Sequence, residues 1–205
     1  MTLFEVLVVI AVLLVLAAIL LPALGKARAR NSAISCVNNL KQVRLAFRIW
    51  SGDNGDKFPM SVSVTNGGTM ELIARGTVFP HFQIMSNELS TPKLLLCPSD
   101  KRQLRATNFN DFNDSNLSYF VGVDASETNS TMLLAGDRNL TLNKTALKPG
   151  LISLNAGDDV GWTTEMHQLA GNVLMADASV QQVSQSGLQF ALKSTGTATN
   201  RLVIP

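Results

Sequence analysis

The sequence is poor in charge, histidine and cysteine, and it lacks the short motifs of the common enzyme classes. Charged residues make up 16% of the 205 positions, against about 25% in a typical soluble domain. This composition argues against a disordered or strongly nucleic-acid-binding chain. Only 2 histidines are available as bases, and the sequence contains no HExxH, GxSxG, P-loop or GxGxxG pattern. We therefore predict that the chain is not an enzyme and binds no specific nucleic acid.

The apolar and charged residues that are present fall into three regions of different character. Residues 1–24 hold 21 apolar residues and a single charge, Glu5. Residues 26–50 carry six basic residues and no acidic one, whereas residues 51–205 carry 11 basic and 14 acidic residues, a net charge of −3. The formal net charge of +2 therefore averages a basic segment and a mildly acidic remainder.

The first region is long enough to cross a membrane. As a helix at about 1.5 Å per residue, residues 1–21 would be about 32 Å long, which matches a bilayer core of about 30 Å. A secretory signal has a basic start and a shorter apolar core of about 7–15 residues, and neither is present here. We predict that residues 1–25 form a transmembrane or filament-core helix.

Three residues distinguish this segment from a plain membrane anchor. An ionisable group in an apolar helix is costly, so Glu5 either rests at the headgroup level or pairs with the α-amino group of a neighbouring chain. Pro22, followed by Gly25, predicts a point where the helix kinks or opens. The basic residues all follow the span, which would place the large domain in the cytoplasm unless a leader with its own positive charges were removed.

The N-terminal residues carry a specific resemblance. The run TLFEVLVVI at residues 2–10, together with Pro22, resembles the start of a processed type IV pilin or type II secretion pseudopilin. The motifs ISCVNNLKQ at residues 34–42, CPSD at 97–100 and GDRN at 136–139 resemble a large bacterial subgroup of prepilin-type proteins. That subgroup has a C-terminal His-x9-Asp-Gly signature, which His167 and Asp177 match in spacing, with Ala178 in place of the glycine.

The resemblance implies a fold, a maturation pathway and a function. It implies removal of a basic leader by a prepilin peptidase and N-methylation of Met1, where the family usually has Phe; whether Met1 is that processed residue or an initiator stays open. The chain would be a structural subunit of a type IV pilus-like filament, assembled by helix bundling with Glu5 paired to a neighbouring N-terminal amine. The alternatives are a pseudopilin that forms a short periplasmic pseudopilus, and a membrane-anchored binding domain.

The same resemblance implies the partners and the location of the chain. It would lie in the bacterial inner membrane as a monomer and then, with the assembly machinery, enter an extracellular homopolymer or a periplasmic pseudopilus. Pro22 and Gly25 would let the helix stretch locally during assembly.

Residues 26–52 continue the helix in amphipathic form. Apolar residues predict a buried face; they are Ile34, Val37, Leu40, Phe47 and Trp50. Lys41, Arg44 and Arg48 form a basic stripe on another face, which is either solvated or in contact with acidic surfaces of neighbouring subunits or with lipid headgroups. The GDN run that follows predicts the end of the helix.

Residues 53–205 predict a globular α+β head domain, with the long helix laid on a mainly antiparallel sheet in a pilin-like fold. Strands are predicted at residues 94–97, 117–123, 131–135 and 201–204, and a hairpin at 171–176 and 180–183. Short helices are predicted at residues 82–89 and 185–192, and residues 61–65 alternate weakly before a turn.

Few residues in the head suggest chemistry. His167 and Asp177 are candidates for a metal or acid–base pair only if a turn near residue 170 brings them together, and a structural turn is the alternative. Asp53, Asp56, Asp158 and Asp159 are oxygen-rich enough to suggest calcium, although neither pair follows EF-hand spacing; otherwise no metal or cofactor is predicted.

The two cysteines leave two alternatives. An extracytoplasmic location permits a disulfide between Cys36 and Cys97. It would close a loop of about 60 residues and stabilise the fold by roughly 4 kcal/mol in the chain-entropy model. The other alternative is two free buried thiols.

Overall fold

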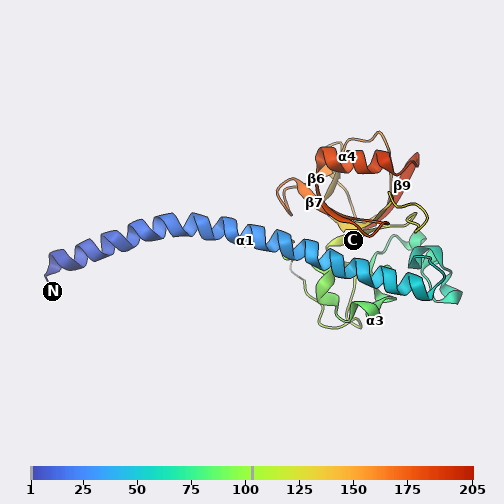
Figure 1. Cartoon of the computed structure of the whole chain (residues 1–205), viewed down its shortest axis with the longest axis horizontal. Coiled ribbons are helices and arrows are strands. Elements are labelled where there is room, and N and C mark those ends of the chain that lie inside the picture. The colour runs from blue at the N-terminus through green and yellow to red at the C-terminus, as the bar shows by residue number, and fades with distance from the viewer. Residues whose placement is uncertain (1, 103) are drawn as a thin grey trace.

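The computed structural model describes residues 2–102 and 104–205, and it confirms the predicted α+β fold. A single long helix, α1 (Leu3–Asp53), carries the head on its C-terminal half and projects away from it with its N-terminal half (Figure 1). At about 1.5 Å per residue, α1 is about 76 Å long. The other helical elements are short and are, in chain order, η1 (Pro59–Ser61), η2 (Val64–Asn66), η3 (Met70–Arg75), α2 (Phe79–Gln83), α3 (Ser86–Leu89), η4 (Pro92–Leu95), η5 (Asp114–Asn116) and α4 (Gln185–Ser194).

The strands of the described residues form two antiparallel sheets. They are β1 (Tyr119–Gly122), β2 (Leu133–Asp137), β3 (Leu140–Leu142), β4 (Thr145–Ala146), β5 (Gly150–Asn155), β6 (Val160–Trp162), β7 (Ala170–Met175), β8 (Val180–Ser184) and β9 (Thr199–Ile204). The main sheet has the order β5-β9-β1-β2-β7-β8, and the small sheet has the order β4-β3-β6. The C-terminal strand β9 lies between β5 and β1, so the chain end is held inside the main sheet.

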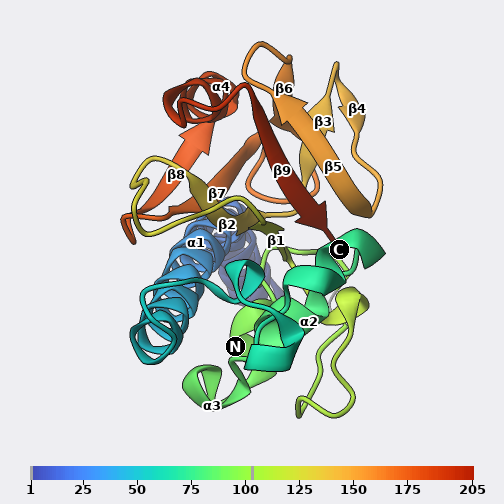
Figure 2. The same cartoon turned by 90° about the vertical axis from the view of Figure 1, so that its right-hand side faces the viewer.

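The main sheet separates two apolar layers (Figure 2). Successive side chains of a strand point to opposite faces, and in β1 Tyr119 and Val121 join the cluster under α1, whereas Phe120 joins the cluster on the other face. That second cluster is covered by α4, through Leu188 and Leu192, and by the small sheet. The central strands β1 and β2 are therefore buried on both faces, in keeping with their unbroken burial.

The buried face of α1 differs from the predicted one at its start. The helix buries six apolar residues against the head, namely Cys36, Leu40, Val43, Ala46, Phe47 and Trp50. Ile34, predicted to share this face, is 52% exposed. A step of three residues falls about 60° short of a full helical turn. Ile34 is two such steps before Leu40, so the two shortfalls add up and the Ile34 side chain lies outside the buried face.

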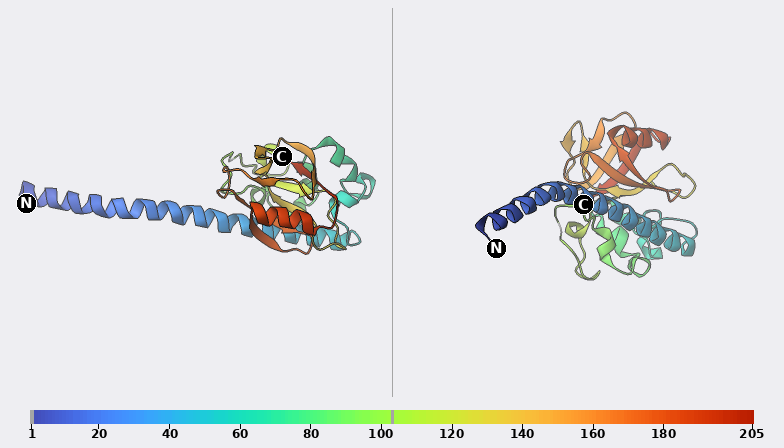
Figure 3. Two further views of the ribbon diagram at one scale, coloured as in Figure 1. Left: turned by 90° about the horizontal axis from the view of Figure 1, so that it is seen from above. Right: turned by 60° about the vertical axis from the view of Figure 1, so that its left-hand side comes forward.

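Pro22 does not interrupt α1. The helix runs through it without a break and curves along its projecting half (Figures 1 and 3). Of the kink or opening predicted at this residue, the opening is absent from this structure, and the projecting half curves as a continuous helix.

Several predicted elements of the head are confirmed. The segments at residues 117–123 and 131–135 contain β1 and most of β2, the hairpin is β7 with β8, the helix at 185–192 is α4, and the last strand is β9. The short strands β3, β4 and β6 were not predicted, because each borders a turn and has too few residues for a clear period. The longer strand β5 was not predicted either.

Three segments between residues 59 and 97 differ from the prediction. The strand predicted at residues 94–97 is absent, because its first two residues lie in η4, which Pro92 starts and Thr91 caps through the amide of Lys93. Residues 61–65 span the end of η1 and the start of η2, with only Val62 and Ser63 extended between them. The predicted helix at 82–89 is divided into α2, which begins earlier, and α3.

Candidate functional site

The projecting half of α1 is apolar on every side and is covered by no part of the head. We call residues 3–24 the apolar segment. Its large apolar side chains are between 42% exposed, at Val6, and 83% exposed, at Leu3. By length and composition α1 contains a stretch that could cross a membrane, and none of that stretch is buried. A helix that is apolar all round requires apolar surroundings on all sides.

Glu5 forms a capping box with Thr2 at the N-terminal end of this segment. Its Oε2 accepts a hydrogen bond of 2.7 Å from the Thr2 amide, while the Thr2 hydroxyl accepts one from the Glu5 amide. A carboxylate in the first turn is stabilised by the unpaired amides and the positive end of the helix dipole. Met1, the predicted site of N-methylation, lies outside the described residues. In this conformation, therefore, Glu5 interacts with its own chain.

The basic stripe is exposed but is not wholly available. Lys41 and Arg44 lie on the exposed face of α1. Arg48 forms an ion pair with Glu127 of the head, and Ser51 donates a hydrogen bond to the same carboxylate. Of the three basic residues, Arg48 thus contributes to the contact between helix and head, whereas Lys41 and Arg44 are exposed.

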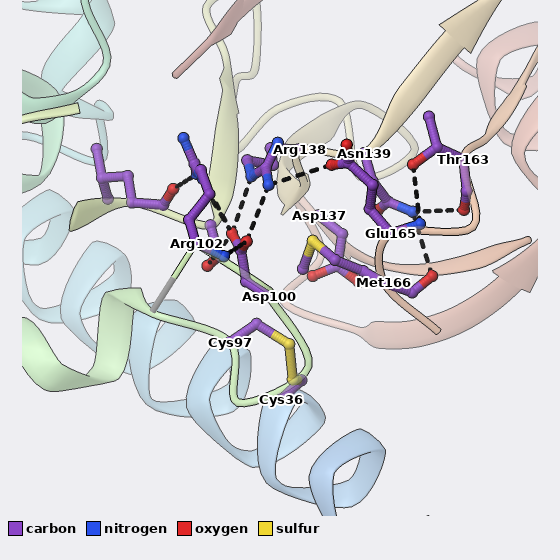
Figure 4. A network of polar contacts seen from close by, with 12 residues as sticks. Cys36, Cys97, Asp100, Arg102, Asp137, Arg138, Asn139, Thr163, Glu165 and Met166 are labelled. Carbon is purple, nitrogen blue, oxygen red and sulfur yellow. Dashed lines mark hydrogen bonds and ion pairs between the residues drawn. A yellow bond between two sulfur atoms is a disulfide. The ribbon is translucent and has the colours of Figure 1, made fainter. Parts of the chain in front are cut away.

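The two cysteines tie α1 to the head. Cys36 and Cys97 are fully buried and joined by a disulfide, with their Cα atoms 5.0 Å apart. Of the two alternatives left by the sequence, the structure therefore contains the disulfide. It fixes the helix to the segment after η4 just where α1 leaves the head (Figure 4).

His167 and Asp177 do not meet. They lie at opposite ends of β7, so the turn that would bring them together is absent. Asp177 caps the hairpin by accepting the Ser179 amide. Ala178 has a left-handed φ of 70°, the conformation that favours the glycine of the resembled signature.

His167 lies instead beside the disulfide, in a buried polar cluster. Its Nε2 is 3.3 Å from Cys97 Sγ, 3.1 Å from Asn172 Nδ2 and 3.4 Å from Asp137 Oδ2. Asp137, at the end of β2, also accepts hydrogen bonds from the Asn172 amide and side chain. In the sequence, Asp137 is noted only as part of the GDRN motif. The signal that could have singled it out is its position as a charged residue at the end of an entirely apolar strand.

A second polar group adjoins the first and is centred on Asp100. Arg138 donates two hydrogen bonds of 2.8 Å to its two carboxylate oxygens, and Ser118 and Arg102 donate to it as well. Arg138 also reaches Glu165 at 3.2 Å, as Figure 4 shows. The Asp100 side chain is completely buried and the Arg138 side chain is 14% exposed. This network joins the segment after the disulfide to the end of β2.

The two buried carboxylates have opposite pKa shifts. Burial by itself would raise the pKa of Asp100. The hydrogen bond and positive charge of Arg138, together with hydrogen bonds from the Arg102 amide and Ser118, outweigh burial and hold this pKa well below its usual range. Burial raises the pKa of Asp137 to about 7, although Asn172 opposes the shift. Burial also lowers the pKa of His167.

We predict that the head loses stability in acid because of Asp100. An unfolded aspartate has a pKa of about 3.9, and the folded pKa is lower. Its contribution is therefore complete above about pH 4 and is lost as the pH falls further, through the folded value. Asp137 acts in the opposite sense, since its raised pKa removes stability as the pH rises from about 4 to about 7.

Urea denaturation of the full chain in detergent between pH 2 and 6 measures this effect. The unfolding midpoint should fall steeply below about pH 4 in the wild type and less steeply in Asp100→Asn, which has no carboxylate to protonate. Equal slopes below pH 4 in the two proteins would show that Asp100 is not responsible.

The acidic residues considered for calcium do not assemble into a site. Asp158 accepts hydrogen bonds from Asn155, and Asp159 from Gln185 and Gln189. Neither these two nor the pair Asp53 and Asp56 belongs to a group of three or more metal-ligating side chains in the described parts of the chain. The one such group there is Cys36, Cys97 and His167.

Comparisons with protein-family models, with curated proteins and with solved structures find no match for this chain.

Proposed function

We propose that this chain is a structural subunit of a type IV pilus-like filament. Residues 1–24 would hold the subunit in the inner membrane before assembly and would form the filament core afterwards. The observation that carries the proposal is the change in character along α1. Residues 3–24 expose apolar side chains on every side, whereas from Cys36 onward one face is buried in the head. The single helix α1 thus joins a segment that requires apolar surroundings to a globular head domain.

Assembly needs a specific register as well as an apolar environment. Burial among neighbouring helices replaces burial in lipid, so the change of environment adds little free energy, and packing and pairing must set the register. Glu5 supports this role. Its local partner is a backbone amide at the end of its own helix, which a neighbouring N-terminal amine would replace or join.

The basic stripe offers a second contact between subunits. Lys41 and Arg44 are exposed, and residues 51–205 have a net charge of −3. In a homopolymer every basic helix face is close to the acidic heads of other subunits, which favours a specific stagger.

Microscopy of material sheared from cells at native expression tests the proposal. We expect long helical filaments made of this chain, with an N-methylated first residue by mass spectrometry. Filaments that never leave the periplasm would favour the pseudopilin alternative, and a monomer that stays in the membrane without self-association would overturn both.

A further inference from the structure

Cys36, Cys97 and His167 bring three metal-ligating atoms to one point. Their two sulfurs and a ring nitrogen all lie within 4.8 Å of one another. The residues come from α1, from the segment after η4 and from the turn before β7. The sequence separates them widely, so only the tertiary structure assembles this group.

The turn that carries His167 adopts an unusual backbone conformation. His167, Gln168 and Leu169 have φ values of 46°, 52° and 63°, a left-handed region that residues other than glycine rarely adopt. The turn nevertheless places the imidazole in the interior, where its side chain is 1% exposed. Backbone conformations of this kind persist where the surroundings enforce them and are frequent at functional sites.

A fourth ligand is available from Asp137. This carboxylate is completely buried, and its Oδ2 is 3.4 Å from His167 Nε2. Its Oδ1 accepts no hydrogen bond from the residues that the structure describes. An oxygen that is buried without a donor is costly, and coordination to a cation would satisfy it.

The distances fit tetrahedral coordination. Zinc bonds of about 2.0–2.3 Å place neighbouring ligand atoms of a tetrahedron about 3.3–3.8 Å apart. The 3.3 Å from His167 Nε2 to Cys97 Sγ lies in this range, and the Asp137 carboxylate is close to the same nitrogen, with its other oxygen, Oδ2, at 3.4 Å. The two sulfurs, which are bonded to each other, would have to separate, and the Asp137 carboxylate, which lies outside the group whose atoms are all within 4.8 Å of one another, would have to move closer to them.

We propose that the dithiol form of this chain binds one zinc ion, with Cys36, Cys97 and His167 as ligands and Asp137 as the fourth. A dithiol reductant breaks the S–S bond by exchange, leaving two thiols on the chain while it becomes a disulfide itself. Each thiol then releases its proton to solvent as its sulfur coordinates the metal. Oxidation by a disulfide reverses the sequence and releases the ion.

Zinc and the disulfide are thus alternative links between α1 and the head. Either one joins Cys36 to Cys97, so the chain keeps this attachment before its cysteines are oxidised as well as after. A cavity of about 490 Å³ beside α1 is lined by His167, Ser99 and Lys101, and the ion would enter from this side. This proposal does not depend on filament formation.

Cobalt and zinc binding to the full chain in detergent tests the proposal. The protein is reduced with a phosphine under anaerobic conditions, freed of reductant and titrated with Co²⁺, then with Zn²⁺. We expect one ion per reduced chain, a thiolate-to-cobalt charge-transfer absorption, displacement of cobalt by zinc and no binding to the oxidised chain. Absence of the charge-transfer absorption in the reduced wild type would overturn the proposal without any variant.

Matched variants test the individual ligands. His167→Ala should weaken zinc binding by about tenfold or more, the effect expected for loss of a zinc-site interaction, and Asp177→Asn should leave binding unchanged because Asp177 lies at the far end of β7. Circular dichroism checks that each variant folds. In the wild type, zinc should also protect both thiols from alkylation. Alkylation at the same rate with and without zinc, or unchanged affinity in a folded His167→Ala, would contradict the assignment.

Discussion

Glu5→Ala is expected to abolish filament formation while leaving membrane insertion intact. The substitution makes the apolar segment more apolar, so insertion loses nothing. In a filament core, an N-terminal amine that has lost its carboxylate partner is a buried unpaired charge, which costs several kcal/mol at each subunit. That cost recurs along the polymer, so it eliminates assembly rather than slowing it.

Glu5→Gln distinguishes pairing from helix capping. In the structure Glu5 caps its own helix by accepting the Thr2 amide, and the glutamine oxygen can accept the same hydrogen bond. If the negative charge of Glu5 is required, the Glu5→Gln protein should form no filaments, as expected for Glu5→Ala. If helix capping is what is required, the Glu5→Gln protein should assemble normally. Membrane fractionation and microscopy of sheared filaments measure the two steps separately, and abundant normal filaments from Glu5→Ala would refute the pairing.

Asp100→Ala is expected to destabilise the head by about 3–5 kcal/mol, the usual cost of removing one partner of a buried ion pair. The completely buried Asp100 carboxylate accepts two hydrogen bonds from Arg138 and others from Ser118 and Arg102. Without it, the largely buried guanidinium of Arg138 keeps only the exposed Glu165 as an ionic partner among the described residues.

Glu165→Ala is the matched control. Glu165 contacts the same guanidinium but is 52% exposed, so its loss should cost less than about 1 kcal/mol. Urea denaturation at pH 7, with the disulfide intact in every protein, gives the two differences in unfolding free energy. Equal effects of the two substitutions would show that burial of Asp100 is not what makes the network important.

The sequence predicted well those elements whose pattern is long or repeated. The α1 helix, α4 and the β7–β8 hairpin follow from extended apolar periodicity and clear turn residues. Prediction failed at residues 94–97, a short apolar run whose first two residues lie in η4. A run of four apolar residues has no period to separate helix from strand, and the capping hydrogen bond from Thr91 decides the outcome.

By itself the sequence determined the division of α1 into an apolar half and an amphipathic half, because composition and periodicity act locally along the chain. It also determined the α+β class and identified Glu5 as the one charge in the apolar segment. Tertiary structure alone decided that His167 lies beside Cys97 and Asp137 rather than near Asp177. The reason is that β7 keeps His167 and Asp177 at its two ends, whereas the packing of β2 and the disulfide segment against α1 brings distant residues together.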